Sequence, residues 1–232
     1  MESKEYLPFE KKSPERNRHP PSSIDVAESD IENSCVNRQF ESIMTSKWGA
    51  DTTGAELVKE FAAEIKGKAI LVTGVTPGGL GAIFAETIAK AQPSTIVLAG
   101  RNKDKIKATT DAIQSANPDV KVKVLELDLG SFSAVRRAAE TINSWDDVPH
   151  IDVLVNNAGI MAVDFGLTED GFERQFGTNH LGPFLFTNLI MGKIRASDMP
   201  RIIVVSSDGH RLGVIRWTDY NYGVGSARAN QR

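Results

Sequence analysis

A glycine-rich stretch is the first feature of the sequence that could do chemistry. Thr73-Gly74-Val75-Thr76-Pro77-Gly78-Gly79-Leu80-Gly81 follows a short apolar run and leads into a helical pattern. Glycines let the backbone turn sharply and approach a pyrophosphate, and the first N–H groups of the next helix attract anions. No Gly-Lys-Ser/Thr follows, so an ATP-type phosphate loop is excluded. On this stretch alone, an ordinary strand–helix turn and a methyltransferase loop both stay open.

The residue after the next apolar run bears on which dinucleotide would bind. Leu98-Ala99-Gly100 leads directly into Arg101. In dinucleotide-binding folds an acid at this place binds the free ribose 2′-hydroxyl, whereas an arginine can bind a 2′-phosphate. Arg101 therefore predicts NADP rather than NAD, and it weakens the methyltransferase interpretation. A surface arginine at a helix start is the alternative, and Lys103 and Lys105 could assist but are expected to be solvated.

The elements that must position these residues alternate along the chain. Apolar runs of strand length lie at Ala69–Thr73, Thr95–Ala99, Val120–Leu127, Ile151–Val155 and Ile202–Ser206. Helical patterns lie at Ala55–Ile65, Leu80–Ala91, Lys103–Ala116, Phe132–Ser144 and Phe172–Ile194. Nearly continuous apolar strands indicate a parallel sheet that is covered on both faces. The alternation predicts an α/β fold, a doubly wound parallel sheet of the Rossmann type.

Composition narrows the class of protein. The 232 residues carry a net charge of −3, which offers no basic field for nucleic acid. The single cysteine, Cys35, excludes a disulfide framework and a cysteine-rich zinc site, and the four histidines show no metal-ligand spacing, so no metal is predicted. No apolar run approaches the roughly 18 residues of a membrane helix, and no secretory signal is present. We therefore expect a cytoplasmic protein without nucleic-acid or membrane partners.

Three segments are predicted along the chain. Residues 1–43 contain none of the nineteen glycines and too few apolar residues for a core, so we expect a disordered N-terminal extension. Residues 44–222 would form the dinucleotide-binding domain. Residues 223–232 would form a divergent C-terminal tail.

Further short motifs follow the glycine stretch in a fixed order. They are Leu127-Asp128-Leu129, Asn156-Asn157-Ala158-Gly159, Gly177-Thr178-Asn179-His180-Leu181-Gly182 and Val204-Val205-Ser206-Ser207. Over roughly Lys47 to Tyr222 the set resembles the short-chain dehydrogenase/reductase family, and most of all its NADP-dependent, retinol-dehydrogenase-like and fungal branch. The resemblance implies an oxidoreductase that interconverts a small-molecule alcohol and a carbonyl with NADP.

The resemblance also implies roles for single residues. The cofactor would lie along Thr73, Gly74, Gly78, Leu80 and Gly81 at its pyrophosphate, Asp128 and Leu129 at its adenine, and Asn157, Ala158 and Gly159 at its ribose. Asn179 would hold a water of the proton relay, and Ser207 would hydrogen-bond the substrate carbonyl. Asp128 could instead cap the next helix, and Asn179 could satisfy a backbone group. The stretch is one residue longer than the family's Thr-Gly-x3-Gly-x-Gly, which leaves the glycine–phosphate pairing open.

The chain departs from the family at the group that protonates the carbonyl. The family uses Tyr-x3-Lys, in which the lysine ammonium lowers the high pKa of the phenol. Here Tyr220 is followed at the fourth place by Val224 and Tyr222 by Ser226, although Trp217–Tyr222 resembles the loop before that motif. We therefore expect a C-terminally truncated member with little or no turnover, and a sheet that is incomplete after the fifth strand.

An incomplete sheet would leave apolar surface uncovered. The fifth strand, Ile202–Val205, would become an apolar sheet edge. The predicted helix Phe172–Ile194, which the resemblance places at the family's dimer interface, should also be exposed. The alternative function is accordingly a non-catalytic NADP-binding or interaction module, in a homo-oligomer or paired with a full-length relative.

Overall fold

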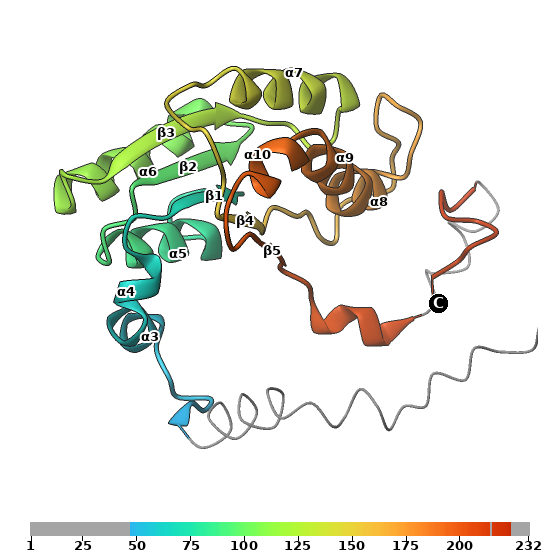
Figure 1. Cartoon of the computed structure of the whole chain (residues 1–232). Helices are drawn as coiled ribbons and strands as arrows, with labels where there is room; N and C mark the ends of the chain where they lie inside the picture. Colours follow the sequence, from blue (N-terminus) through green and yellow to red (C-terminus); the bar gives the residue numbers. More distant parts are fainter. Residues whose placement is uncertain (1–46, 214, 224–232) are drawn as a thin grey trace, which may run out of the picture. The chain divides into compact units, whose positions relative to one another are not determined.

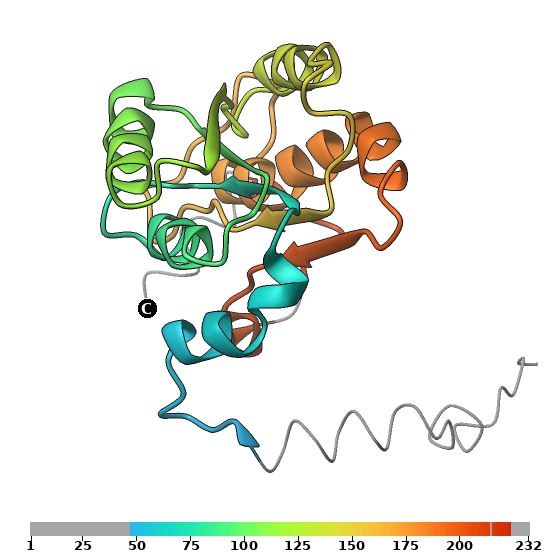
Figure 2. The same cartoon turned by 60° about the vertical axis from the view of Figure 1, so that its left-hand side comes forward.

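A parallel sheet carries the fold, with its strands in the order β3-β2-β1-β4-β5 (Figures 1 and 2). The strands are β1 (Ala69–Thr73), β2 (Thr95–Gly100), β3 (Lys121–Glu126), β4 (Val153–Asn156) and β5 (Arg201–Val204). The chain order reverses between β1 and β4, so the predicted doubly wound, Rossmann-type fold is confirmed. This computed structural model describes residues 47–213 and 215–223, and the predicted extension 1–43 and tail beyond 223 lie outside the described residues.

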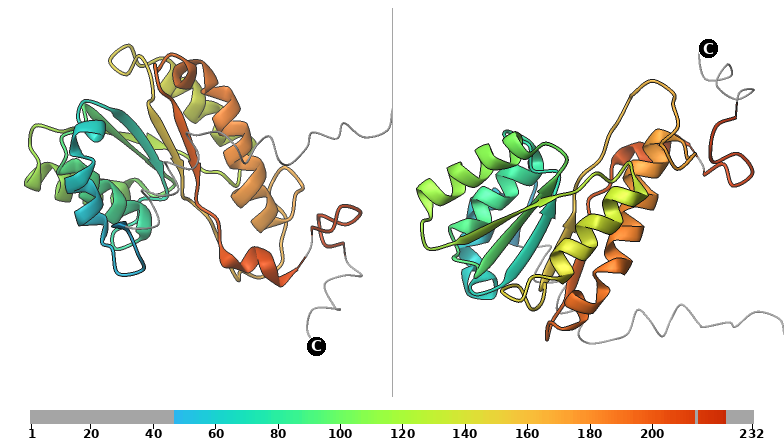
Figure 3. Two further views of the ribbon diagram at one scale, coloured as in Figure 1. Left: turned by 60° about the horizontal axis from the view of Figure 1, so that its bottom comes forward. Right: turned by 90° about the horizontal axis from the view of Figure 1, so that it is seen from above.

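Helices cover both faces of this sheet (Figure 3). One face carries α5 (Leu80–Ala89) and α6 (Lys103–Ala116), and the other carries α7 (Phe132–Asn143), α9 (Gly182–Leu189) and α10 (Met191–Arg195). Before β1 lie α3 (Gly54–Glu60) and α4 (Ala62–Ile65). The other described elements are α8 (Arg174–Phe176), a π-helix at Gly177–Leu181 and a 3-10 helix at Asp208–Leu212.

The side chains of β1 and β2 alternate between two apolar cores. Leu71 and Val97 pack in the core with α7 and α9, whereas Ile70 and Ile96 pack in the core with α5 and α6. All five residues of β1 are buried, as its continuous apolar sequence predicts. Burying one such side chain stabilises the fold by about 1.5–3 kcal/mol. The two cores therefore hold the carboxyl ends of the central strands firmly in place.

Two helix predictions are wrong in their continuity. Instead of one helix over Phe172–Ile194, the chain forms α8, the π-helix, α9 and α10 in succession. Helix begins only after Glu173, because this residue is extended and its carboxylate accepts hydrogen bonds from the next N–H groups. The π-helix ends at Leu181, and the next residue, Gly182, packs so closely on the Leu129 carbonyl that a Cβ would overlap the oxygen. The predicted helix Ala55–Ile65 is likewise interrupted at Phe61.

The two edges of the described sheet differ in character. At the β3 edge, side-chain hydrogen bonds from Lys121 and Lys123 lower the pKa of Asp147 to about 2, and these charges discourage pairing with another strand. At the β5 edge, Ile202 to Val205 are 42–67% exposed, so the predicted apolar edge is confirmed. On α9, Phe184 is 64% exposed, which agrees with the predicted exposure of that helix.

At the amino edge of the sheet, Asp152 joins three segments. Its buried carboxylate accepts hydrogen bonds from the Ala69 N–H and the Ser197 hydroxyl, both at 2.7 Å. Lys68 Nζ lies 3.5 Å and His150 Nε2 3.4 Å from the same carboxylate. Burial raises the pKa of Asp152, but the hydrogen bonds and the two basic groups outweigh it, so the pKa lies below its usual value. Asp152 thereby fixes β4 against β1 at the end opposite the candidate site.

Candidate functional site

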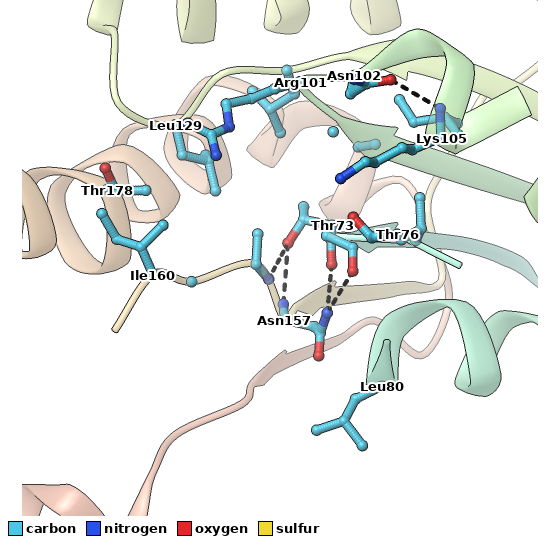
Figure 4. Close-up of a pocket in the computed structure, with 18 residues that line it drawn as sticks. Thr73, Thr76, Leu80, Arg101, Asn102, Lys105, Leu129, Asn157, Ile160 and Thr178 are labelled. Atoms are coloured by element: carbon cyan, nitrogen blue, oxygen red, sulfur yellow. Dashed lines mark hydrogen bonds between the residues drawn. The ribbon is translucent and has the colours of Figure 1, made fainter. Parts of the chain in front are cut away.

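A cleft of about 380 Å³ lies at the carboxyl ends of β1, β2 and β4 (Figure 4). It opens where the chain order reverses, which is the usual ligand position in open α/β sheets. Of the predicted cofactor residues, the ones that line it are Thr73, Gly74, Leu80, Arg101, Leu129, Asn157, Ala158 and Gly159. Gly78, Gly81 and Asp128 are not among its lining residues, and neither are Asn179 and Ser207.

Thr73 and Asn157 fasten one wall of the cleft. The Thr73 hydroxyl accepts hydrogen bonds from the N–H groups of Asn157, at 3.1 Å, and Ala158, at 3.0 Å. In return the Asn157 amide nitrogen donates to the carbonyls of Thr73, at 2.8 Å, and Gly74, at 3.1 Å. The end of β1 and the turn after β4 are therefore one hydrogen-bonded unit, drawn with dashed lines in Figure 4.

Two glycines of the glycine-rich stretch, residues 73–81, pack where no side chain fits. Gly74 has a φ of +76°, and a Cβ there would lie 2.7 Å from the Ala158 Cα. At Gly81 a Cβ would lie 2.5 Å from the Asn157 amide nitrogen and 2.6 Å from the Gly74 carbonyl oxygen. Gly79 is the N-cap of α5 and supplies no side-chain cap, so the first N–H groups of this helix lack a side-chain partner. Such an end attracts an anion.

The opposite wall of the cleft carries two cations, Arg101 and Lys105 (Figure 4). Their neighbours differ from them, because Lys103 pairs with Glu126 at 2.7 Å and Lys107 with Asp111 at 2.7 Å. Within residues 47–213 and 215–223 the side chains of Arg101 and Lys105 have no such carboxylate partner. Lys105 is exposed, as expected, and it also lines the cleft.

Asp128 serves a local turn. Its carboxylate accepts a hydrogen bond from the Gly130 N–H at 2.9 Å, and the cap of α7 is Ser131 instead. The alternative in which Asp128 caps the next helix is therefore wrong. The carboxylate keeps further lone pairs that could accept from a ligand amino group.

Asn179 lies on the π-helix and holds the backbone of Ile160. Its amide nitrogen donates to the Ile160 carbonyl, and its amide oxygen accepts from the Ile160 N–H, each at 2.8 Å. Ile160 lines the cleft, so Asn179 reaches the site through this residue. Both side-chain atoms keep hydrogen-bonding capacity, because an amide nitrogen has two hydrogens and the oxygen two lone pairs.

Ser207 follows β5 and begins the 3-10 helix Asp208–Leu212. Its hydroxyl oxygen accepts from the Gly209 N–H at 3.1 Å. No other hydrogen bond of this hydroxyl is present among the described residues, so its proton is available to a ligand. The described contacts do not bring Ser207 to the cleft wall.

Comparison with known proteins agrees with this arrangement. Residues 68–222 match the family model of the short chain dehydrogenases. Human retinol dehydrogenase 13 is 40% identical over 160 residues, which are 69% of this chain and 47% of that protein. Oxidoreductase fscI of Fusarium equiseti is 34% identical over 181 residues, which cover 76% of this chain and 69% of that oxidoreductase. The chain belongs to the short chain dehydrogenase family.

A solved structure supports the fold. The crystal structure of an uncharacterized protein from Mycobacterium paratuberculosis is 37% identical and superposes with a TM-score of 0.56, covering 70% of this chain and 56% of its own. The chain spans about half the length of the retinol dehydrogenases that it matches. Among the described residues, no helix has both the length and the apolarity needed to cross a membrane.

Several residues that line the cleft were not predicted from the sequence as site residues. They are Val75, Thr76, Ala99, Gly100, Asn102, Ile106, Leu127, Ile160 and Thr178. Most of them lie next to a motif that was recognised in the sequence, and this position could have indicated that they line the site. Ile160 directly follows the Asn-Asn-Ala-Gly turn, and Thr178 precedes Asn179. Asn102 accepts from the Lys105 N–H at 2.9 Å and so starts α6 beside Arg101.

Proposed function

We propose that this chain binds NADP(H) in the cleft and carries part of a site that interconverts an alcohol and a carbonyl. Two features support such a cofactor: the N-terminal end of α5 lacks a side-chain cap, and Gly74 and Gly81 hold the glycine-rich stretch closely against the turn after β4. When bound, NADPH would supply a hydride. The retinol dehydrogenases that the chain matches support this reaction class.

The observation that carries the choice of NADP is the charge of the cleft. None of its lining residues is acidic, and Arg101 and Lys105 are the two cations that line it. An anionic 2′-phosphate would be held by charge-assisted hydrogen bonds from these groups, whereas a free 2′-hydroxyl favours a carboxylate. The neighbouring Lys103 and Lys107 are already paired with acids, which leaves Arg101 and Lys105 for the ligand.

The chain's own groups would act on the substrate as follows. Ser207 would hold the substrate carbonyl oxygen by a hydrogen bond from its hydroxyl, which keeps its proton. Asn179 would keep Ile160 beside the cleft and bind a water with its remaining amide hydrogen. Asp128 would accept from the adenine amino group, and Asn157 would hold the turn against which the ribose lies.

We further propose that the 232 residues alone turn over little substrate. Neither Tyr220 nor Tyr222 is followed at the fourth place by a lysine. Without a general acid the chemical step slows by about 10²–10⁴-fold.

Arg101→Ala tests the cofactor assignment. We expect NADPH to bind about tenfold more weakly, the lower end of the range for an exposed charged hydrogen bond, and NADH affinity to stay unchanged. Lys103→Ala is the matched control, because this lysine pairs with Glu126. Equal NADPH affinity in the two variants would refute NADP binding at this position.

A second function, an interaction module, is favoured by the exposed Phe184 and by the apolar β5 edge. In that case the purified chain should associate with itself or with a longer relative. Sedimentation analysis of the wild type and of Phe184→Asp separates this function from the first. A monomeric wild type that binds NADPH would support the first proposal alone.

A further inference from the structure

A turn late in the chain is docked on the loop that follows β4. Residues 216–223 are bonded among themselves, with the Tyr222 N–H donating to the Asp219 carbonyl and the Gly223 N–H to the Asp219 carboxylate. From this 216–223 turn, Asn221 reaches across to the loop. Its amide oxygen accepts from the Glu173 N–H at 2.8 Å, and its amide nitrogen donates to the Gly171 carbonyl at 3.1 Å. Asn221 thus mimics a backbone partner for two residues that lie some 50 positions earlier.

Aromatic contacts strengthen the same docking. The Tyr220 ring lies 5.7 Å from the Phe176 ring and 6.5 Å from the Phe172 ring, between centroids. Phe176 in turn stacks on His180 at 5.5 Å. Rings at these distances attract one another beyond their buried area. Tyr220 and Asn221 therefore contact α8 and the residues just before it, and Phe176 connects them to His180 of the π-helix.

Glu173, to which Asn221 is hydrogen-bonded, is connected to the candidate site through α8 and the π-helix. Glu173, which Asn221 holds by its N–H, caps α8 through its carboxylate bonds to Gln175 and Phe176. The π-helix that follows carries Asn179, whose amide fixes the backbone of Ile160 at the cleft. A shift of Glu173 would therefore move the helix start and, with it, Asn179.

We propose that Asn221 is a positioning residue for the alcohol–carbonyl site. The 216–223 turn comes after Ser207 in the chain, and Asn221 ties it to the segment that bears Asn179. Ser207, proposed to hold the substrate carbonyl, and Asn179, proposed to hold Ile160 and a water, come from separate segments, after β5 and after β4. Through its side-chain oxygen and nitrogen, Asn221 joins these two segments by hydrogen bonds. This proposal rests on the proposed function.

Hydrogen exchange resolved to single amides tests it on the full 232-residue chain. In Asn221→Ala we expect the amides of Glu173 and Ile160 to exchange about tenfold faster, since two hydrogen bonds are lost. Core amides such as Leu71 should not change. Asn188→Ala is the matched control, because that amide donates only within α9, to the Phe184 carbonyl.

Tyr220 supplies a second pair of variants should Asn221→Ala fail to fold. Tyr220→Ala should accelerate exchange at Ile160, and Tyr220→Phe, which keeps the ring, should restore it. Unchanged exchange at Ile160 in the alanine variants, or an equal rise at Leu71, overturns the positioning role. NADPH titration of the wild type is read separately. Absence of binding there contradicts the proposed function, whatever the exchange results.

Discussion

Replacing Thr73 with valine removes one hydroxyl from the centre of the candidate site and leaves the side-chain shape almost unchanged. Thr73 is 1% exposed, and its oxygen serves the N–H groups of both Asn157 and Ala158. These N–H groups begin the turn that lines the cleft. Thr73→Val therefore asks whether a single hydroxyl holds the turn after β4 on the end of β1.

The expected loss of stability depends on which hydrogen bonds the two N–H groups keep in the variant. The Asn157 N–H also donates to the Val155 carbonyl at 3.1 Å, so it keeps a partner in the variant. The Ala158 N–H has no other described acceptor and would be left unpaired, which costs about 1–3 kcal/mol. Ala158 is only partly buried, and water from the cleft can offset some of this cost. We expect a loss of about 2 kcal/mol in the free energy of unfolding.

Urea unfolding followed by circular dichroism measures this loss, and Thr95→Val is the control. Thr95 is also buried, on the adjacent strand, but its hydroxyl makes no hydrogen bond within the described part of the chain. We expect Thr95→Val to change the unfolding free energy by less than about 0.5 kcal/mol. If Thr73→Val is as stable as Thr95→Val, the hydroxyl does not hold the turn, and the reasoning fails.

Two further variants probe the loop and the opposite edge. Gly81→Ala should abolish NADPH binding and lower stability by about 1–3 kcal/mol, because its Cβ would meet Asn157 at 2.5 Å; Gly192→Ala, with open space around it, should do neither. The pKa of Asp152 is lower in the folded protein than in the unfolded chain, where it is about 4. The carboxylate therefore stabilises the fold at pH values above about 4, and this stabilisation is lost as the pH falls through the pKa of the folded state. In urea unfolding measured at several pH values, Asp152→Asn should reduce the fall in unfolding free energy at acid pH. If the variant loses stability toward acid pH as steeply as the wild type, Asp152 is not the group responsible.

The sequence was most informative where local and tertiary signals agree. The bounds of β1 and α6 match their predictions because a continuous apolar run and an Asn102 cap are both visible in the residues themselves. Several of the predicted cofactor residues line one cleft, since short motifs follow the ends of β1, β2 and β4. Parallel strands bring such ends to one edge of the sheet without further information.

What sequence reasoning missed depends on contacts between distant segments. The change from π-helix to α-helix occurs at Gly182, which packs on the Leu129 carbonyl, a neighbour 53 positions away that no helical periodicity encodes. The hydrogen bonds of Asn221 to Gly171 and Glu173 are equally remote in the chain. Likewise, nothing local distinguishes Lys105 at the cleft from Lys103 beside Glu126.

The extra residue of the glycine-rich stretch shows how contacts between distant segments bear on the candidate site. The loop is anchored at its two ends, by Gly74 against Ala158 and by Gly81 against Asn157. Between these anchors the Gly79 N–H donates to the Thr76 carbonyl at 2.9 Å, and Gly78 has a φ of +76° with open space around its Cα. We infer that this turn accommodates the additional residue. Gly81, in the first turn of α5, packs on Asn157, which lines the cleft, so the first N–H groups of the helix are expected beside the cleft.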